Sequence, residues 1–157
     1  MPEAPREFKP LNDLGALPLN ESSELKFYVD EFKGFKYGSI RTFVKGDAYS
    51  GPTKSGVTFN PTVLAGVIET LAKLPTEPQA LSDQELARFP KKMGVELVVR
   101  VTIFKDATGI DIREWVSDQE YKGWSKKGVR IPYKGLPQTL KLLREMQQHV
   151  GAPRTKA

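Results

Sequence analysis

The stretch that decides the fold is residues 95–116, VELVVRVTIFKDATGIDIREWV. In its first ten residues apolar side chains recur at every second position, which is the period of a half-buried strand. The turn-forming run KDATG at 105–109 follows. Ile110, Ile112 and Val116 then keep to one face of a second strand. The stretch therefore predicts two consecutive strands joined by a turn, with one face buried.

The same pattern occurs twice in the chain. A constant offset places residues 25–74 over residues 97–146 without a gap, and 14 of the 50 positions are identical. Average composition would give only about 6% identity by chance. The identical pairs are Leu25/Leu97, Val29/Val101, Phe32/Phe104, Lys33/Lys105, Ile40/Ile112, Arg41/Arg113, Val44/Val116, Tyr49/Tyr121, Gly51/Gly123, Lys54/Lys126, Gly56/Gly128, Val57/Val129, Leu64/Leu136 and Leu71/Leu143. An internal duplication explains this agreement.

Each copy predicts four strands followed by one helix, an α+β unit. In the second copy, segments near 120–125 and 128–132 are expected to be the third and fourth strands. The first helix should start at Asn60 and Pro61, a capping residue followed by a proline suited to a first helical turn. A unit of about 50 residues buries too little apolar surface to fold alone. We therefore predict that two tandem units pack together as an intramolecular pseudo-dimer with approximate two-fold symmetry.

The predicted units are residues 25–74 and 95–150. Residues 1–24 contain four prolines and an acidic excess, and predict a mostly irregular arm. Residues 75–94 form a linker in which SDQE at 82–85 resembles a capping box and predicts a short helix reaching Phe89. Residues 151–157 form a basic tail.

Composition excludes several functional classes. The chain has no cysteine, which rules out disulfides, cysteine-bound metals and a thiol nucleophile. Its one histidine, His149, speaks against a multi-histidine metal site or a serine–histidine–aspartate triad. We expect no cofactor and no metal. No apolar run approaches the roughly 20 residues of a membrane span, and the N-terminus lacks the features of a signal peptide. An intracellular protein with no membrane partner is expected, in the cytoplasm or nucleoid of a prokaryote or phage-infected cell, or in a eukaryotic nucleus.

Charge and aromatic rings point to a polyanion. The net charge is +5, and each of the segments 25–74 and 95–149 carries +3. On the strands, cations and rings alternate on the side away from the predicted core. Rings stack on unpaired bases, worth about 1–3 kcal/mol per base, and cations neutralise phosphates. The candidate nucleic-acid contacts are Lys26, Phe32, Lys33, Lys36, Arg41, Phe43, Lys54, Arg100, Phe104, Lys105, Arg113, Trp115, Trp124, Lys126, Lys127 and Arg130. Alternatively, the rings pair across strands or fill the core, and Arg41 and Arg113 form ion pairs.

Two motifs resemble a known family. The second copy carries FKDATGIDIREW at 104–115 and SKKGVRIP at 125–132, and the first carries FKG at 32–34 and KSGVTFNP at 54–61. These resemble the FKG, IDIREYW and GRKGISLNP motifs of the transcriptional coactivator positive cofactor 4 family. The resemblance implies a curved four-stranded antiparallel sheet plus a helix, dimer-like pairing, and binding of single-stranded or melted DNA.

The resemblance implies DNA contacts from the FKG, arginine, aromatic and lysine positions of both copies, and a role as a transcription cofactor or protector of unpaired DNA. The first copy departs from the family pattern at Phe35, Ser39, Thr42 and Ser55, and the second at Ala107. Because the chain holds two copies, it is expected to act as a monomer in place of the family's dimer.

Three other functions stay open at this stage. RNA could bind the same surface, although each copy lacks the helix order of an RNA-recognition motif. A protein-interaction module in transcription could use the leucines of the arm, Leu11, Leu14, Leu17 and Leu19, to dock transcription machinery. Asp106, Asp111 and Glu114 could form a nuclease site, but the first copy has Gly34, Ser39 and Thr42 at the matching positions. We expect a non-catalytic protein.

Overall fold

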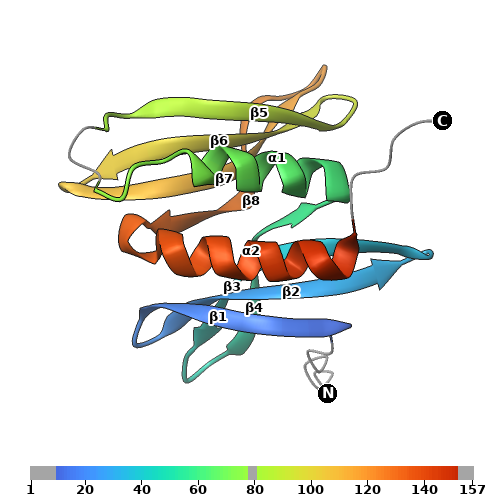
Figure 1. The fold of residues 1–157 in the computed structure, drawn as a ribbon, viewed down its shortest axis with the longest axis horizontal. Coiled ribbons are helices and arrows are strands. Elements are labelled where there is room, and N and C mark those ends of the chain that lie inside the picture. Colours follow the sequence, from blue (N-terminus) through green and yellow to red (C-terminus); the bar gives the residue numbers. More distant parts are fainter. Residues whose placement is uncertain (1–9, 78–80, 152–157) are drawn as a thin grey trace.

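The structure, a computed structural model, describes residues 10–77 and 81–151. Two four-stranded antiparallel sheets are each followed by a helix, which confirms the predicted α+β class and its two tandem units (Figure 1). The first sheet contains β1 (Asn12–Asn20), β2 (Ser23–Phe32), β3 (Phe35–Lys45) and β4 (Ser50–Phe59), and the second contains β5 (Gln84–Lys92), β6 (Val95–Phe104), β7 (Ala107–Ser117) and β8 (Lys122–Pro132). The helices are α1 (Pro61–Ala72) and α2 (Leu136–Val150), the latter preceded by a 3-10 turn, η2 (Tyr133–Gly135).

The offset between the two copies holds for the strands as well as for single residues. Each strand of the second sheet begins where this offset places its counterpart, at the paired positions Asn12 and Gln84, Ser23 and Val95, Phe35 and Ala107, and Ser50 and Lys122. Both sheets also have the same strand order, in which sequential strands are neighbours. The duplication read from the sequence is therefore a duplication of structure.

The first strand of each sheet occupies a segment where no strand was predicted. Strand β1 lies in the predicted irregular arm, and β5 replaces the predicted linker helix, so both predictions are wrong there. Each is an edge strand with two register shifts and a proline, Pro18 or Pro90. Such shifts hide the period-2 alternation, and an edge strand tolerates proline. The rest of the predicted arm, residues 1–9, and residues 152–157 of the tail lie outside the described residues.

The arm's leucines also have a structural role. Leu14, Leu17 and Leu19 pack against the core, whereas Leu11 is exposed. These three leucines are half-buried against the core, so among the four only Leu11 offers a largely exposed side chain to a partner.

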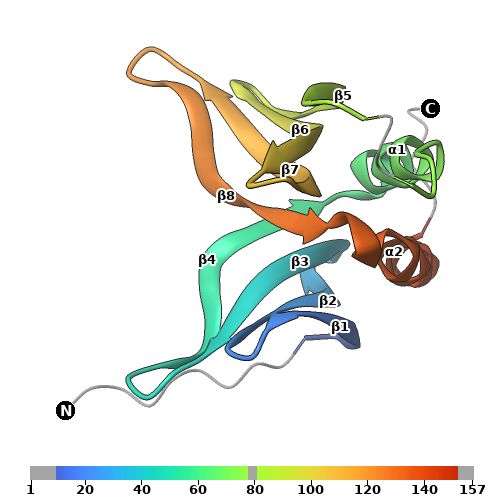
Figure 2. The same cartoon turned by 90° about the vertical axis from the view of Figure 1, so that its left-hand side faces the viewer.

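Strand β8 corrects another prediction. Segments 120–125 and 128–132 are not two strands, because Lys122–Pro132 is continuous. A register shift between Arg113 and Trp115 of β7 marks an irregularity in its pairing with β8, and β4 has the equivalent shift opposite β3. Such irregularities bend a strand and increase its twist. Figure 2 shows β4 and β8 as long curved strands that lie beside each other at the centre of the molecule.

The start of the first helix follows the sequence prediction. The Asn60 side chain accepts a hydrogen bond from the Val63 amide at 2.8 Å, and Pro61 occupies the first turn of α1. Helix α1 ends at Ala72, before Pro75. Helix α2 starts at Leu136 and carries Pro137 in its first turn.

The two units share one core. Helix α2 of the second unit packs on β1, β2 and β3 of the first, and α1 packs beside α2 and against β5 (Figure 2). The approach is close enough that a Cβ atom at Gly38 would lie 2.1 Å from the Met146 sulfur. Buried apolar residues of both units form a single cluster. This shared core confirms the predicted packing of the units within the chain.

Candidate nucleic-acid interface

The candidate interface begins with two arginines that are equivalent in the repeat. Each lies on the outer face of its sheet, which we define as the face turned away from the helices. Arg41 of β3 pairs with Gly56 of β4, and Arg113 of β7 pairs with Gly128 of β8. A Cβ atom at either glycine would lie 2.7 Å from the Cζ of its arginine. The missing side chain therefore lets each guanidinium lie flat against the strand.

Hydrogen bonds hold both arginines in place. Arg41 donates from Nε to the Tyr28 hydroxyl at 3.1 Å and from an Nη to the Thr53 carbonyl at 2.8 Å. Arg113 donates to the Ser125 carbonyl and to Asp111, both at 3.3 Å. The ion-pair alternative thus holds for Arg113, whereas these two bonds of Arg41 go to neutral oxygens. A guanidinium oriented by neutral partners keeps its full charge for an anion.

Basic residues of both units meet in a cleft between the sheets, which we call the central cleft. The first unit contributes Arg41, Lys54, Gly56 and Thr58, and the second contributes Lys91, Lys92, Val95, Glu114, Ser125, Lys126 and Lys127. Among these described lining residues, six are basic and one is acidic. Four of the lysines, at positions 54, 92, 126 and 127, are exposed. The cleft is therefore a strongly positive surface, positioned where β4 and β8 meet.

The carboxylate that lines the cleft has a structural partner. Lys91 binds Glu114 with a 2.8 Å separation between Nζ and Oε2, and it also donates to the Thr58 hydroxyl at 3.0 Å. The Lys91 and Glu114 side chains are 17% and 9% exposed. Because Thr58 belongs to the first unit, this contact ties the two sheets together. It also neutralises the single negative group among the described residues of the cleft.

The second unit carries a tryptophan cluster on its outer face. Trp115 and Trp124 pair across β7 and β8 and meet edge to face, with 4.8 Å between ring centroids. Arg100 lies over Trp124 at 4.0 Å, and Arg88 lies over Trp115 at 5.7 Å. Asp111 is buried and binds Arg100 at 2.7 Å. Arg88 also pairs with Glu85 and Glu96, so carboxylates bind both cations of this cluster, and its rings are the groups that can stack on unpaired nucleotides.

The first unit has a pocket at the equivalent place. Phe43 and Pro52 pair where the second unit has its two tryptophans. The ring of Phe43 is only 7% exposed, with the Lys26 ammonium 4.7 Å from its centroid. The prediction that this ring stands on the surface is wrong, because it is recessed in a cavity of about 640 Å³ that Lys26, Tyr49 and Pro52 also line. We call this cavity the first-unit pocket.

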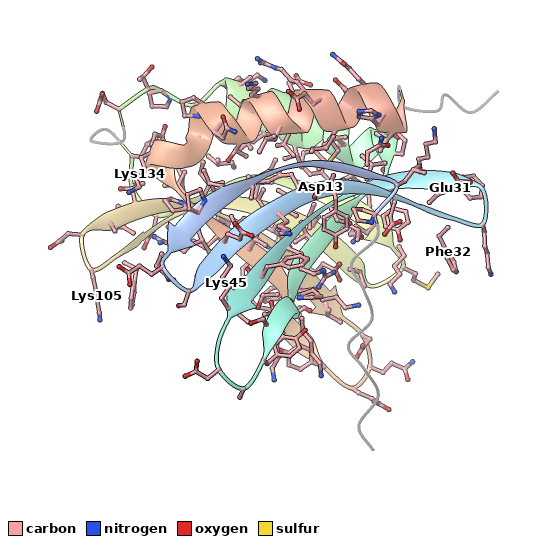
Figure 3. The ribbon with its side chains drawn as sticks, turned by 90° about the horizontal axis from the view of Figure 1, so that it is seen from below. Asp13, Glu31, Phe32, Lys45, Lys105 and Lys134 are labelled. Carbon is pink, nitrogen blue, oxygen red and sulfur yellow. The ribbon has the colours of Figure 1, made fainter. Side chains whose placement is uncertain are left out.

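The hairpin turns that follow Phe32 and Phe104 lie far from the central cleft. These two rings are 62% and 65% exposed, and each has the next lysine, Lys33 or Lys105, at 5.3 or 5.4 Å from its ring centroid. Both lysines have a positive φ, at 52° and 50°, which turns the hairpin sharply. Figure 3 shows Phe32 and Lys105 at opposite ends of the molecule. Lys36, also predicted as a contact, is exposed at the start of β3, near the Phe32 end.

Arg130 is occupied inside its own sheet. It donates to the Thr102 hydroxyl at 3.0 Å, to the Thr102 carbonyl at 3.2 Å and to the Ala107 carbonyl at 2.9 Å. A Cβ atom at Gly109 would lie 2.6 Å from its Cζ. These bonds join β8 to both strands of the neighbouring hairpin. Arg130 therefore has a structural role, since its guanidinium is held by hydrogen bonds within the second sheet.

The structure brings together only part of the predicted set. Arg41, Lys54, Lys126 and Lys127 meet in the central cleft. Lys91 and Lys92 were missed, because their segment was assigned to a linker. The offset of the repeat aligns them with the end of β1 in the first unit, and this alignment was the signal that could have placed them on a strand.

The structure also bears on the possible nuclease site and on membrane spans. Asp111 and Glu114, two of the proposed nuclease carboxylates, are bound by Arg100, Arg113 and Lys91. In the described part of the chain, no group of three or more histidine, cysteine or acidic residues is arranged to hold a metal ion. No helix within the described ranges is long and apolar enough to cross a membrane.

Comparisons with known proteins add little at this point. No protein-family model matches the chain, and no curated protein matches it in sequence. Among solved structures, the chain is similar to one described as the crystal structure of WHY3 from Arabidopsis thaliana, with a TM-score of 0.46 and 9% sequence identity. The similarity covers 94% of this chain and 90% of that chain. So distant a likeness carries no argument about function, and the resemblance to the positive cofactor 4 family stays a prediction.

Proposed function

We propose that this protein binds single-stranded nucleic acid, and that DNA is its natural ligand. The strand would cross the central cleft and continue over the outer faces of both sheets. The observation that carries the proposal is the gathering of six basic side chains from two sheets in one cleft, with Glu114 already bound to Lys91. A site of this charge attracts a polyanion and releases its counterions.

The aromatic groups beside the cleft favour a single strand over a duplex. On β7, Trp115 lies two residues from Arg113, and on β3, Phe43 lies two residues from Arg41. Trp115 is therefore a half-buried ring beside the cations of the second unit, whereas Phe43, only 7% exposed, lines the first-unit pocket beside those of the first. Unpaired bases expose faces that can stack on such rings, whereas a duplex hides them. Within the described residues, neither unit places a helix on its outer face, where a major-groove reader would need one.

The finer parts of the proposal follow from the family resemblance. We propose little sequence preference, no catalysis, and a role as a transcription cofactor or as a protector of unpaired DNA. Since two units already share one core within a chain, the active species is expected to be a monomer. Light scattering that gives the mass of a single chain would support this, and a larger assembly would count against it.

Binding is tested by fluorescence anisotropy at two salt concentrations. The ligands are a labelled thymidine oligonucleotide long enough to cross both sheets, a duplex of equal length, and the matching RNA. We expect the single-stranded DNA to bind most tightly. The logarithm of its affinity should fall by about 0.7 per phosphate contact for each tenfold rise in salt.

A charge-matched pair of variants locates the site. Replacing Lys54, Lys126 and Lys127 by glutamine removes three charges from the cleft. The control removes three charges from the helical side by the same substitution at Lys73, Lys134 and Lys141, all of them exposed. We expect the cleft variant to lose at least tenfold more affinity than the control and to show a smaller salt slope. Equal losses in both variants would show that only net charge matters and would refute the cleft. If the RNA binds more tightly than the single-stranded DNA, the cleft remains the proposed site, but DNA is not the natural ligand.

A further inference from the structure

The two halves of the duplicated fold are not equivalent at one place on their outer faces. In the second unit, Trp124 fills the space beside Trp115, with 4.8 Å between the ring centroids. In the first unit, Pro52 holds the position of Trp124, and the smaller side chain leaves the first-unit pocket, about 640 Å³ in volume. That volume lies within the range of small-molecule sites, roughly 300–1,000 Å³.

The residues that line the pocket suit a flat ring. Phe43 presents an aromatic surface, and Pro18 and Pro52 add apolar surface. Tyr49 is 48% exposed, and its hydroxyl donates to the Pro52 carbonyl, which fixes the phenol across the hairpin. Two lysines, Lys26 and Lys45, and two glutamates, Glu21 and Glu24, also line the pocket. A nucleobase stacks on aromatic rings and is itself uncharged, so it fits a lining whose charges balance, while its phosphate can pair with a lysine at the rim.

The pocket and the central cleft share no lining residue, but they are lined by neighbouring positions of the same two strands. Arg41 lines the cleft and Phe43 lines the pocket, two residues apart on the same face of β3. On β4, Lys54 lines the cleft and Pro52 lines the pocket. Two residues of a strand span about 7 Å. A nucleic-acid strand held by Arg41 and Lys54 therefore reaches the pocket without leaving the surface.

We infer that the first-unit pocket takes one base of the bound strand by insertion, whereas the second unit offers only stacking on its tryptophan cluster. This inference rests on the proposed function. It has a consequence for strand direction. In a symmetric pseudo-dimer, turning the strand end for end gives the same complex. The pocket removes that equivalence, so the strand binds with one preferred polarity.

Photocrosslinking tests the polarity directly. A thymidine oligonucleotide carries a single 5-iododeoxyuridine at its 5′ end or at its 3′ end, and crosslinked peptides are identified by mass spectrometry. One end should crosslink to Phe43 or Tyr49 and the other end to Trp115 or Trp124. Equal crosslinking of both ends to both units would overturn the inference.

Filling the pocket tests the insertion. Pro52→Trp places in the first unit the residue that the second unit has at Trp124. The control, Ala48→Trp, adds the same ring on the same hairpin at an exposed residue that does not line the pocket. We expect about a tenfold loss of affinity for Pro52→Trp, loss of its crosslinks to Tyr49, and an unchanged salt slope. Ala48→Trp should bind as the unchanged protein does.

A second variant covers the case in which Pro52→Trp folds poorly. Tyr49→Leu removes an exposed ring and keeps the position apolar, so the fold should be retained, and affinity should fall several-fold. If neither variant binds more weakly while the unchanged protein binds single strands with the expected salt slope, the pocket inference fails and the proposed function stands. If the unchanged protein does not bind single strands at all, the proposed function itself fails.

Discussion

Gly38 offers a sharp test of the packing on which the central cleft depends. Its Cβ position would lie 2.1 Å from the sulfur of Met146 and 2.5 Å from its Cγ, whereas nonbonded carbon atoms normally meet at about 3.5–4.0 Å. Met146 is fully buried, so its side chain has little room to move. Gly38→Ala should therefore lower the free energy of unfolding by about 1–3 kcal/mol, the usual cost of overpacking.

The same contact can be relieved from the other side. Met146→Ala alone should cost about 2–5 kcal/mol through the cavity it leaves. In the double variant, the new methyl group at position 38 enters the vacated space. The combined loss should thus be smaller than the sum of the single losses by about 0.5–3 kcal/mol.

Urea unfolding followed by circular dichroism measures the free energy of unfolding of four proteins, which are the unchanged protein, the two single variants and the double variant. Lys36→Ala is the control, since this residue is exposed on the same strand and should change stability by no more than about 0.5 kcal/mol. Additive losses within about 0.5 kcal/mol would show that helix α2 does not rest on β3 of the first unit. The proposed cleft would then lose its structural basis.

Three further predictions concern other parts of the molecule. Phe32→Ser and Phe104→Ser should leave stability unchanged, because both rings are largely exposed, and should weaken binding of long but not short oligonucleotides in an anisotropy titration. Lys91→Met should cost about 3–5 kcal/mol in urea unfolding by leaving Glu114 buried without its partner, and the further change Glu114→Leu should restore most of that loss. Burial, and to a smaller extent Glu77, raises the pKa of Tyr133 above 10.0, so the folded state holds a proton that the unfolded chain loses first. Its contribution should be complete below about pH 10 and lost as the pH rises through the folded pKa, and Tyr133→Phe should show a flatter decline in this range.

Much of the architecture could be predicted from local patterns. The ungapped repeat implied a duplicated unit, and alternation located the central strands β2, β3, β6 and β7. The edge strands escaped notice because bulges and prolines break their alternation. Their signal was nevertheless present, since Leu14/Leu86 and Pro18/Pro90 are identical pairs at the same offset as the rest of the repeat.

The candidate site was harder to predict than the fold. Lys54 and Lys126 were recognised from the repeat and Lys127 from its place beside Lys126, and the structure gathers all three in one cleft. Phe32 and Lys105, which were recognised in the same way, lie at opposite ends of the molecule (Figure 3). Alternation along a strand tells which face a residue occupies, but it does not tell which faces meet.

By itself, the sequence determined the repeating unit, the face that each central strand buries and the start of the first helix. These properties depend on neighbours within a few residues, through alternation, turn chemistry and capping. Only the tertiary structure decided that basic residues of two units share one cleft, and that Lys91 reaches Thr58 across it. It also decided that Phe43 lies in a pocket while Trp115 is covered by Trp124. Those outcomes depend on how distant segments pack. They also depend on the volume of the side chain at one repeated position, which is Pro52 in the first unit and Trp124 in the second. No local pattern shows the effect of that volume.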